Sequence, residues 1–457
     1  MGWKITASTR DAWLGPALAG KDTTNVENVE VVFVDGPAMA RYMMVGKTAR
    51  SPKSVARSVW NMVSSKATKV VIGFDDPNIG DPCNLRDQVA IERAQRCTAE
   101  PLPDDVALSI TEAALPTTDG RTATWEEQLA SRVGKRAAFL CLADALKRIV
   151  IEEASEDQTQ SVTITPPFGG RSGKESPWHF PFNSAGPFAE VLATRPCGEA
   201  EGQIAHCAKN MIETALERNN HPPKWSWISI DTDAFVQSLG FPPINGTLVV
   251  GRGYEYRDVI YASETAALKA RNEAGAKRRK VAPQKVWRHY SLDKITSTIL
   301  KGHSAGLFAR SQLLMMCAAG VDYCSGLGRY GWTSQRLLDE IYTGGKVIVQ
   351  TDQDMSIDVI VFQKMLRRSR RQKRGDSELT NFLQELCRIV YCVRYYSWGD
   401  PSKVTYDLTE FDALGATTID GWLSSSFTTD SYLVPIGARQ CAGSGTEPLR
   451  RYNVFTN

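Results

Sequence analysis

The chain has 457 residues, of which 42% are hydrophobic and 23% charged, and a net charge of +3; this length suits two domains or one large α/β domain with insertions. Several protein classes are excluded, because no apolar run approaches the roughly 18–20 residues that cross a bilayer, the first residues lack a secretory signal, and the ten cysteines form no CxxC pair. We therefore expect an intracellular protein with reduced cysteines, no zinc site and no membrane partner.

Three short apolar stretches are predicted to form buried strands. They span residues 29–34, 70–74 and 225–230. Aspartates follow each stretch: Asp35 the first, Asp75 the second, and Asp231 and Asp233 the third. Helical patterns separate the stretches, which indicates a mainly parallel sheet with helical crossovers. In such sheets, sites form at the carboxyl ends of the strands.

The remaining segments are predicted from composition and periodicity. Helical patterns cover residues 54–63, 125–151 and 200–218. Residues 99–124, rich in Pro, Thr and Asp, indicate an exposed connection, and residues 166–187 a loop. Residues 251–288 are polar and basic and are the best candidate for a mobile insert.

Basic residues are concentrated in two places. Lys277-Arg278-Arg279-Lys280 is one cluster, and the other lies between residues 364 and 374. The second comprises Lys364, Arg367, Arg368, Arg370, Arg371, Lys373 and Arg374. Such runs favour contacts with phosphates or a nuclear import signal over an ordinary solvated surface, which usually mixes charges of both signs.

Seven acidic residues stand at the ends of predicted strands or at the starts of helices. They are Asp35, Asp75, Glu199, Glu201, Asp231, Asp233 and Asp322. A lone aspartate after a strand often only caps the next helix. Several carboxylates brought together repel one another, and hard divalent cations such as Mg²⁺ relieve that repulsion. Two such ions support the hydrolysis of phosphodiester bonds.

These acids, in order and in local sequence, resemble those of the flap endonuclease/XPG superfamily of structure-specific 5′ nucleases. Residues 70–75, Val-Val-Ile-Gly-Phe-Asp, resemble its strand ending in Phe-Asp-Gly, although Asp76 replaces the glycine. Residues 198–202, Gly-Glu-Ala-Glu-Gly, are similar to its Ser-Glu-Ala-Glu-Ala motif. Residues 230–233 match a paired-aspartate motif, and residues 320–324 a Gly-x-Asp-Tyr-Cys motif.

Two further segments extend the resemblance. Residues 325–331, Ser-Gly-Leu-Gly-Arg-Tyr-Gly, resemble the glycine hairpin of the family's helix–two-turn–helix element, which grips duplex DNA and often holds K⁺. Arg86 and Arg93, seven residues apart, resemble the basic pair on its first arch helix. About four extra residues separate this helix from Asp75, and an exposed helix with ion pairs is the competing interpretation.

The resemblance implies a PIN-like/5′-nuclease fold: a central, mostly parallel sheet flanked by helices, with a helical arch and a helix–two-turn–helix element. The seven acids are then expected to hold two Mg²⁺ ions, with Mn²⁺ as a substitute, and Arg86 and Arg93 to act on the scissile phosphate. The residues expected to contact DNA are Gly2, Arg86, Arg93, Arg96, Gly326, Gly328, Arg329 and Gly331.

Four regions are expected, and the resemblance covers the first and the third of them. Residues 1–98 form the N-terminal nuclease region, 99–189 the arch and an insert, 190–345 the internal nuclease region, and 346–457 a C-terminal helical extension with the basic run. The expected substrate is DNA with junctions between single and double strands, in the nucleus or in a viral replication compartment. No Gln-x-x-Leu-x-x-aromatic-aromatic motif near the C-terminus indicates docking to a sliding clamp.

Three alternatives remain open at the level of sequence. The first is a catalytically inactive relative that serves as a scaffold or binds RNA. The second is a 5′→3′ exoribonuclease with a similar acidic site, against which the glycine hairpin argues. The third is a non-catalytic nucleic-acid-binding protein, which would leave the ordered carboxylates unexplained.

Overall fold

The structure is a computed structural model. It describes residues 29–44, 51–64, 67–75, 124–130, 132–153, 160–167, 175–180, 188–193, 200–231, 234, 245–257, 259–261, 263–275, 281–294 and short pieces between 320 and 361.

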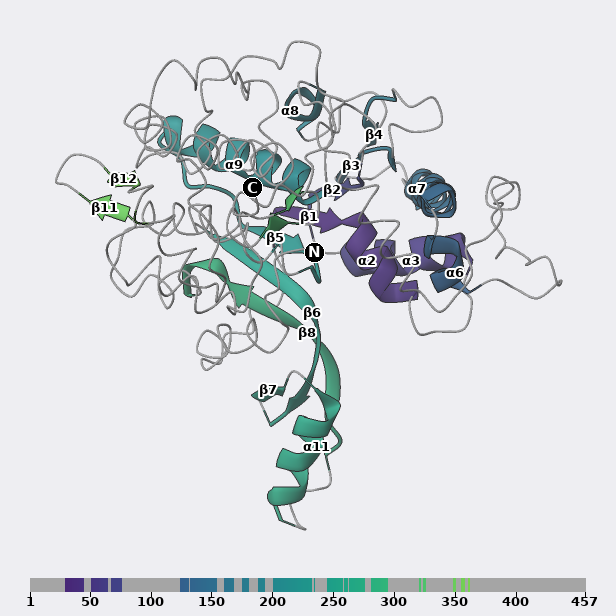
Figure 1. The fold of residues 1–457 in the computed structure, drawn as a ribbon, viewed down its shortest axis with the longest axis vertical. Helices are drawn as coiled ribbons and strands as arrows, with labels where there is room; N and C mark the ends of the chain where they lie inside the picture. The colour runs from purple at the N-terminus through teal and green to yellow at the C-terminus, as the bar shows by residue number, and fades with distance from the viewer. Residues whose placement is uncertain are drawn as a thin grey trace, which may run out of the picture.

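The described part of the chain forms a mixed α/β fold around an eight-stranded sheet (Figure 1). Its strands are β1 (Val31–Asp35), β2 (Lys69–Gly73), β3 (Ser161–Ile164), β4 (Trp178–Phe180), β5 (Trp225–Ile228), β6 (Gly246–Tyr256), β7 (Val259–Tyr261) and β8 (Gln284–Ser291). The order is β4-β3-β2-β1-β5-β6-β7, and β8 also pairs with β6. The central strands β3, β2, β1, β5 and β6 are parallel, and β4, β7 and β8 add antiparallel edges.

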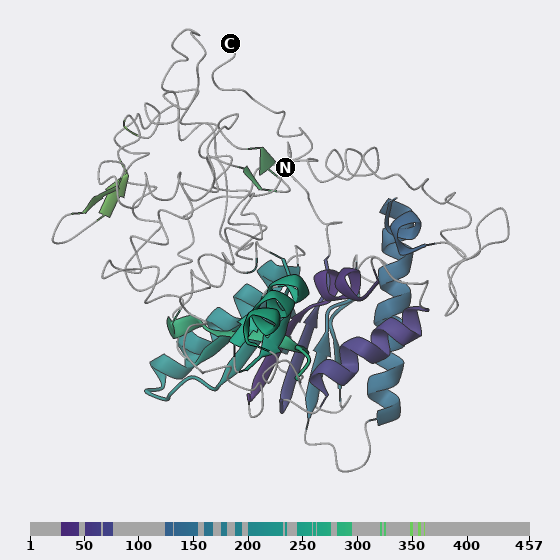
Figure 2. The ribbon, with the colours of Figure 1, turned by 90° about the horizontal axis from the view of Figure 1, so that it is seen from below.

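Helices cover both faces of the central strands (Figures 1 and 2). The helices are α2 (Gly36–Met44), α3 (Pro52–Val63), α6 (Trp125–Ala130), α7 (Arg132–Glu153), α8 (Ala189–Ala193), α9 (Ala200–Glu217) and α11 (Glu264–Glu273). Two small antiparallel pairs lie further along the chain: β9 (Gly320–Val321) with β10 (Cys324–Ser325), and β11 (Ile348–Gln350) with β12 (Met355–Ile357).

Alternation along the strands divides the core between the two faces of the sheet. Val32 and Val34 of β1 lie in one large buried cluster with Trp60 of α3 and Phe139 of α7. The intervening Phe33 faces the other side, where its ring contacts Phe188. Because successive side chains of a strand point to opposite faces, a strand buried on both sides must be apolar throughout. The sequence Val-Val-Phe-Val of β1 meets that requirement.

The predicted strands and helices agree with the structure to within one or two residues in most places. The helical pattern over 125–151 is two helices, α6 and α7, rather than one. Helix α3 begins after Ser51, whose hydroxyl accepts a hydrogen bond from the Ser54 N–H, with Pro52 in the first turn. Strand β4 lies within the predicted loop over 166–187.

Residues 251–288, interpreted from sequence as a mobile insert, contain regular structure. The end of β6, together with β7, α11 and β8, forms an antiparallel extension that projects beyond the other strands (Figure 1). Gly253 explains part of this packing, because a Cβ there would lie 2.8 Å from Ile260 Cγ2 on β7. Strands from three of the four expected regions thus share one sheet.

Candidate active site

Asp35 is the last residue of β1 and is buried, with a relative exposure of 1%. Its Oδ1 accepts a hydrogen bond of 3.0 Å from the Ala38 N–H in the first turn of α2, so it caps that helix. Its Oδ2 accepts a hydrogen bond of 2.6 Å from the hydroxyl of Ser229, just after β5. The Ser229 hydroxyl oxygen accepts in turn from the Asp231 N–H at 3.1 Å. This chain of hydrogen bonds ties the ends of β1 and β5 together.

Asp75 lies two residues after β2 and is also buried. Its Oδ1 accepts a hydrogen bond of 3.1 Å from the Ala200 N–H at the start of α9. Its Oδ2 lies 3.6 Å from Nζ of Lys135 on α7. The amino end of a helix and an ammonium group both favour a carboxylate in its ionised form. Segments 60 and 125 residues away therefore position Asp75.

Two hydrogen bonds hold Phe74, just after β2, against α9 and against the end of β3. Nε2 of Gln203 donates to the Phe74 carbonyl at 2.9 Å, and the Phe74 N–H donates to Oγ1 of Thr165 at 2.7 Å. Glu201, one residue into α9, is buried with 8% of its surface exposed. The carboxyl edge of the sheet thus brings Asp35, Asp75 and Asp231 together with the helix that carries Glu201.

The electrostatics of this edge are unfavourable for negative charge. Burial is the largest of the causes that raise the pKa of Asp35 from 3.8 to about 7, and the negative charges of Asp231 and Asp75 contribute to the rise. The hydrogen bonds from Ser229 and Ala38 act in the opposite direction without cancelling the rise. A bound cation would relieve both the repulsion and the loss of hydration.

Many of the predicted site residues lie outside the described residues. They are Gly2, Arg86, Arg93, Arg96, Glu199, Asp233, Asp322, Gly326, Gly328, Arg329 and Gly331. Within the part of the chain that is described, no three His, Cys, Asp or Glu side chains are grouped so as to hold a metal ion. Asp35, Asp75, Asp231 and Glu201 therefore do not by themselves make up a complete set of ligands.

The described donors nevertheless suit a hard cation. Carboxylate oxygens are the preferred ligands of Mg²⁺, and a carboxylate oxygen can accept more than one contact. The raised pKa of Asp35 reflects uncompensated negative charge in a buried place. The residues present are in this sense compatible with Mg²⁺.

Two residues that contact the buried acids were not predicted from the sequence. Ser229 lies two positions before Asp231, and a small polar residue at the end of an apolar strand was the available signal. Lys135 lies within the helical pattern predicted over residues 125–151, and nothing local connects it with Asp75.

No family model matches the chain, and no curated protein is significantly similar to it. Among the helices in the described residues, none has the length and apolar character needed to cross a membrane.

Proposed function

We propose that the protein is a metal-dependent nuclease with a PIN-like/5′-nuclease fold, which hydrolyses phosphodiester bonds in flap, nicked or branched DNA. One observation carries the proposal: the buried carboxylates of Asp35 and Asp75 follow the adjacent parallel strands β1 and β2, and the charge of Asp231, after the neighbouring strand β5, repels that of Asp35. The sequence motifs around the seven acids support the same conclusion.

The strand order supports an active site at this edge. Along the parallel centre the chain order reverses between β1 and β5, since β2 and β3 extend the sheet beyond β1 and β6 extends it beyond β5. Crossover helices leave the sheet in opposite directions at such a point, and ligands bind in the crevice beyond the carboxyl ends of the strands. Asp35 and Asp231 follow the two strands that flank this point.

The chain's own residues would hold and orient the metal ligands. Asp35, Asp75, Asp231 and Glu201, with Glu199, Asp233 and Asp322, would hold Mg²⁺. Bound Mg²⁺ would supply charge stabilisation for the phosphate and a more acidic water. The Ser229 hydroxyl fixes the orientation of Asp35, and the Ala200 N–H fixes that of Asp75.

A cleavage assay tests this proposal. Labelled flap, nicked, gapped and single-stranded DNA and single-stranded RNA are incubated with the protein in Mg²⁺ or in chelator. We expect Mg²⁺-dependent cleavage near the junctions of flap and nicked DNA. Degradation of RNA alone from its 5′ end would favour an exoribonuclease, and stability of every substrate would contradict the proposal.

Lys135 offers a separate test of the cation site. Its ammonium group partly neutralises Asp75, so Lys135→Met should lower the melting temperature in chelator. A bound cation would replace that charge, so the stabilisation by Mg²⁺ should be larger in the variant than in the wild type. Thermal melts at several Mg²⁺ concentrations measure both effects.

Lys147→Met is the matched control, because Lys147 lies on the same helix and packs over the Trp178 ring, 4.7 Å from its centroid. Its Mg²⁺ response should equal that of the wild type. If Mg²⁺ stabilised all three proteins equally, Lys135 would not contribute to the cation site.

A further inference from the structure

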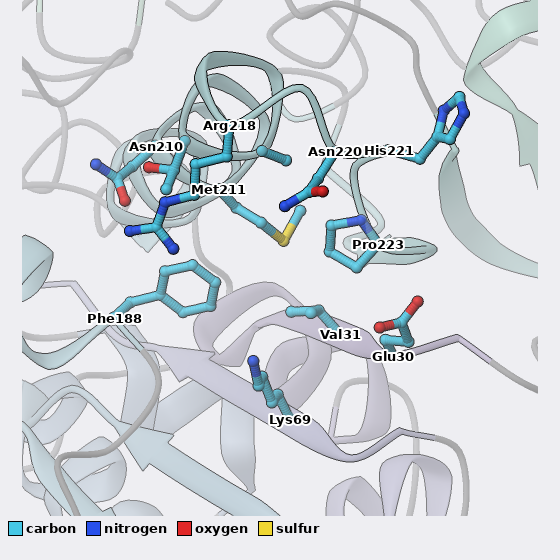
Figure 3. A pocket seen from close by; sticks show the side chains of 12 residues that line it. Glu30, Val31, Lys69, Phe188, Asn210, Met211, Arg218, Asn220, His221 and Pro223 are labelled. Atoms are coloured by element: carbon cyan, nitrogen blue, oxygen red, sulfur yellow. The ribbon is translucent and has the colours of Figure 1, made fainter.

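A pocket of about 410 Å³ lies at the opposite end of the sheet from the acidic residues (Figure 3). Val31 and Lys69, paired at the starts of β1 and β2, form one wall, and the last turns of α9 form the other. Asp35 ends the same β1 strand, which at five residues spans roughly 13 Å. The pocket is therefore separate from the candidate active site, and its volume falls in the range of small-molecule sites.

Two cationic side chains face this pocket from opposite walls. Figure 3 shows the ammonium group of Lys69 and the guanidinium group of Arg218 approaching the Phe188 ring from two sides. Neither group forms an ion pair within the part of the chain that the structure describes. Because both groups line the same pocket, one anionic group placed between them would meet both charges, and a guanidinium binds phosphate well.

Phe188 provides a fixed aromatic surface beside these cations. Its backbone has a φ of 63°, in the left-handed region that bulky residues rarely adopt. Its ring packs against Phe33, with centroids 5.5 Å apart, while part of it lines the pocket. A residue keeps a strained backbone conformation only where the surrounding structure holds it, and such residues are concentrated at binding sites. A ring held in this way is ready to stack on a flat ligand group.

The other end of the pocket carries acceptor and amide groups. The Glu30 carboxylate lies there and accepts a hydrogen bond of 3.4 Å from the Lys224 N–H. The Asn220 side chain is directed into the pocket (Figure 3). Its backbone is held by the end of α9, where the Asn220 N–H donates to the Ala215 carbonyl at 2.8 Å. These groups can bind hydroxyl or amino donors of a ligand whose anionic group lies between Lys69 and Arg218.

We propose that this pocket binds a nucleotide, with its phosphate between Lys69 and Arg218, its base on Phe188 and its sugar hydroxyls toward Glu30. The three kinds of group in the pocket match the three parts of a nucleotide. The proposal does not depend on nuclease activity, because none of these residues belongs to the candidate active site. The nucleotide is either free or part of an unpaired strand.

Isothermal titration calorimetry with AMP, in chelator, tests the proposal on the full chain. We expect AMP to bind with a dissociation constant below about 1 mM, and more tightly than either inorganic phosphate or adenosine. The double variant Lys69→Gln/Arg218→Gln should bind AMP at least about tenfold more weakly. Phe188→Leu keeps an apolar contact with Phe33. It should weaken the binding of AMP by about fivefold or more and leave the binding of inorganic phosphate unchanged.

The control variant Lys53→Gln/Lys285→Gln removes the same charge from exposed positions outside the pocket and should bind AMP like the wild type. A short single-stranded oligonucleotide identifies the source of the ligand. If the oligonucleotide displaces AMP at a concentration lower than that of AMP, the pocket binds a nucleotide of a strand. Otherwise it binds a free nucleotide. Unchanged AMP affinity in the pocket double variant, or no binding up to about 10 mM AMP, would overturn the proposal.

Discussion

Asp35→Asn should abolish Mg²⁺-dependent cleavage and at the same time stabilise the metal-free protein. Asparagine lacks the charge that a divalent cation requires, and losing one charged ligand should lower the single-turnover rate by at least about 10²–10³-fold. Binding of DNA should persist, because Asp35 is buried and has little surface that could contact DNA. Single-turnover kinetics on a flap substrate and a separate binding titration measure the two quantities.

The gain in stability follows from the raised pKa of Asp35. Ionising a carboxyl group whose pKa rises from 3.8 to about 7 on folding costs on the order of 4 kcal/mol at high pH. Asparagine avoids this cost and keeps the hydrogen bond from Ala38, but it no longer accepts one from Ser229, which forfeits about 1 kcal/mol. At pH 8 in chelator, the variant should therefore melt several degrees above the wild type.

The stability gained by Asp35→Asn should depend on pH. The folded-state pKa of Asp35 lies above its unfolded value, so the folded protein binds the extra proton between about pH 4 and 7. The stability contributed by this group is complete below that window and is lost as the pH rises to about 7. The advantage of Asp35→Asn should therefore be large at pH 8, much smaller at pH 5, and absent or reversed below about pH 4.

Glu217→Gln is the control, because Glu217 is an exposed acid at the end of α9, away from the acidic edge. Its melting temperature and cleavage rate should follow the wild type at both pH values. If Asp35→Asn cut flap DNA at the wild-type rate, Asp35 would be a helix cap alone.

Gly36→Ala should destabilise the fold and reduce cleavage, although alanine is normally the better residue in a helix by about 1 kcal/mol. A Cβ at Gly36 would lie 2.7 Å from the Gly73 carbonyl oxygen and 2.9 Å from two ring carbons of Phe74. That oxygen belongs to β2, which pairs with β1 through Asp35 and Gly73, so it cannot move without separating the two strands. We expect a loss of about 1–3 kcal/mol in the free energy of unfolding.

The same displacement would move Asp35 relative to Asp75, so cleavage should fall by more than the unfolded fraction explains. Gly73→Ala is the matched control, because the nearest atom to its Cβ, the Ala200 carbonyl oxygen, lies 3.3 Å away. Urea unfolding should give a clearly lower free energy of unfolding for Gly36→Ala than for Gly73→Ala. Equal stability of the two variants would mean that β1 and β2 tolerate separation at this point.

The sequence by itself determined the central elements and the acidic residues that follow them. Apolar runs buried on both faces made β1, β2 and β5 recognisable, and each is followed within a few residues by an aspartate. The helical period of α9 was equally clear. These features are local, because burial on a strand or a helix face imposes a pattern that neighbouring residues carry.

Only the tertiary structure decided the elements that depend on distant partners. Strand β6 contains Gly251 and Gly253 and has weak strand character, yet it pairs with β5, β7 and β8. Strand β3 is four residues long and pairs with β2 from some 90 residues away. Ladder hydrogen bonds and packing stabilise both, and the short runs Val-Thr-Ile in β3 and Thr-Leu-Val-Val in β6 do not by themselves indicate which strands they pair with.

The surroundings of the acids were likewise decided by the fold. Ser229 reaches Asp35 across 194 residues, and the first N–H of α9 reaches Asp75 across 125. The pKa of Asp35 depends on the hydration that it loses on folding and on the charges of Asp231 and Asp75, and these charges come from segments distant in sequence. Residue type and spacing identified the carboxylates, whereas their charge state and orientation arise from contacts that exist only after the parallel strands have paired.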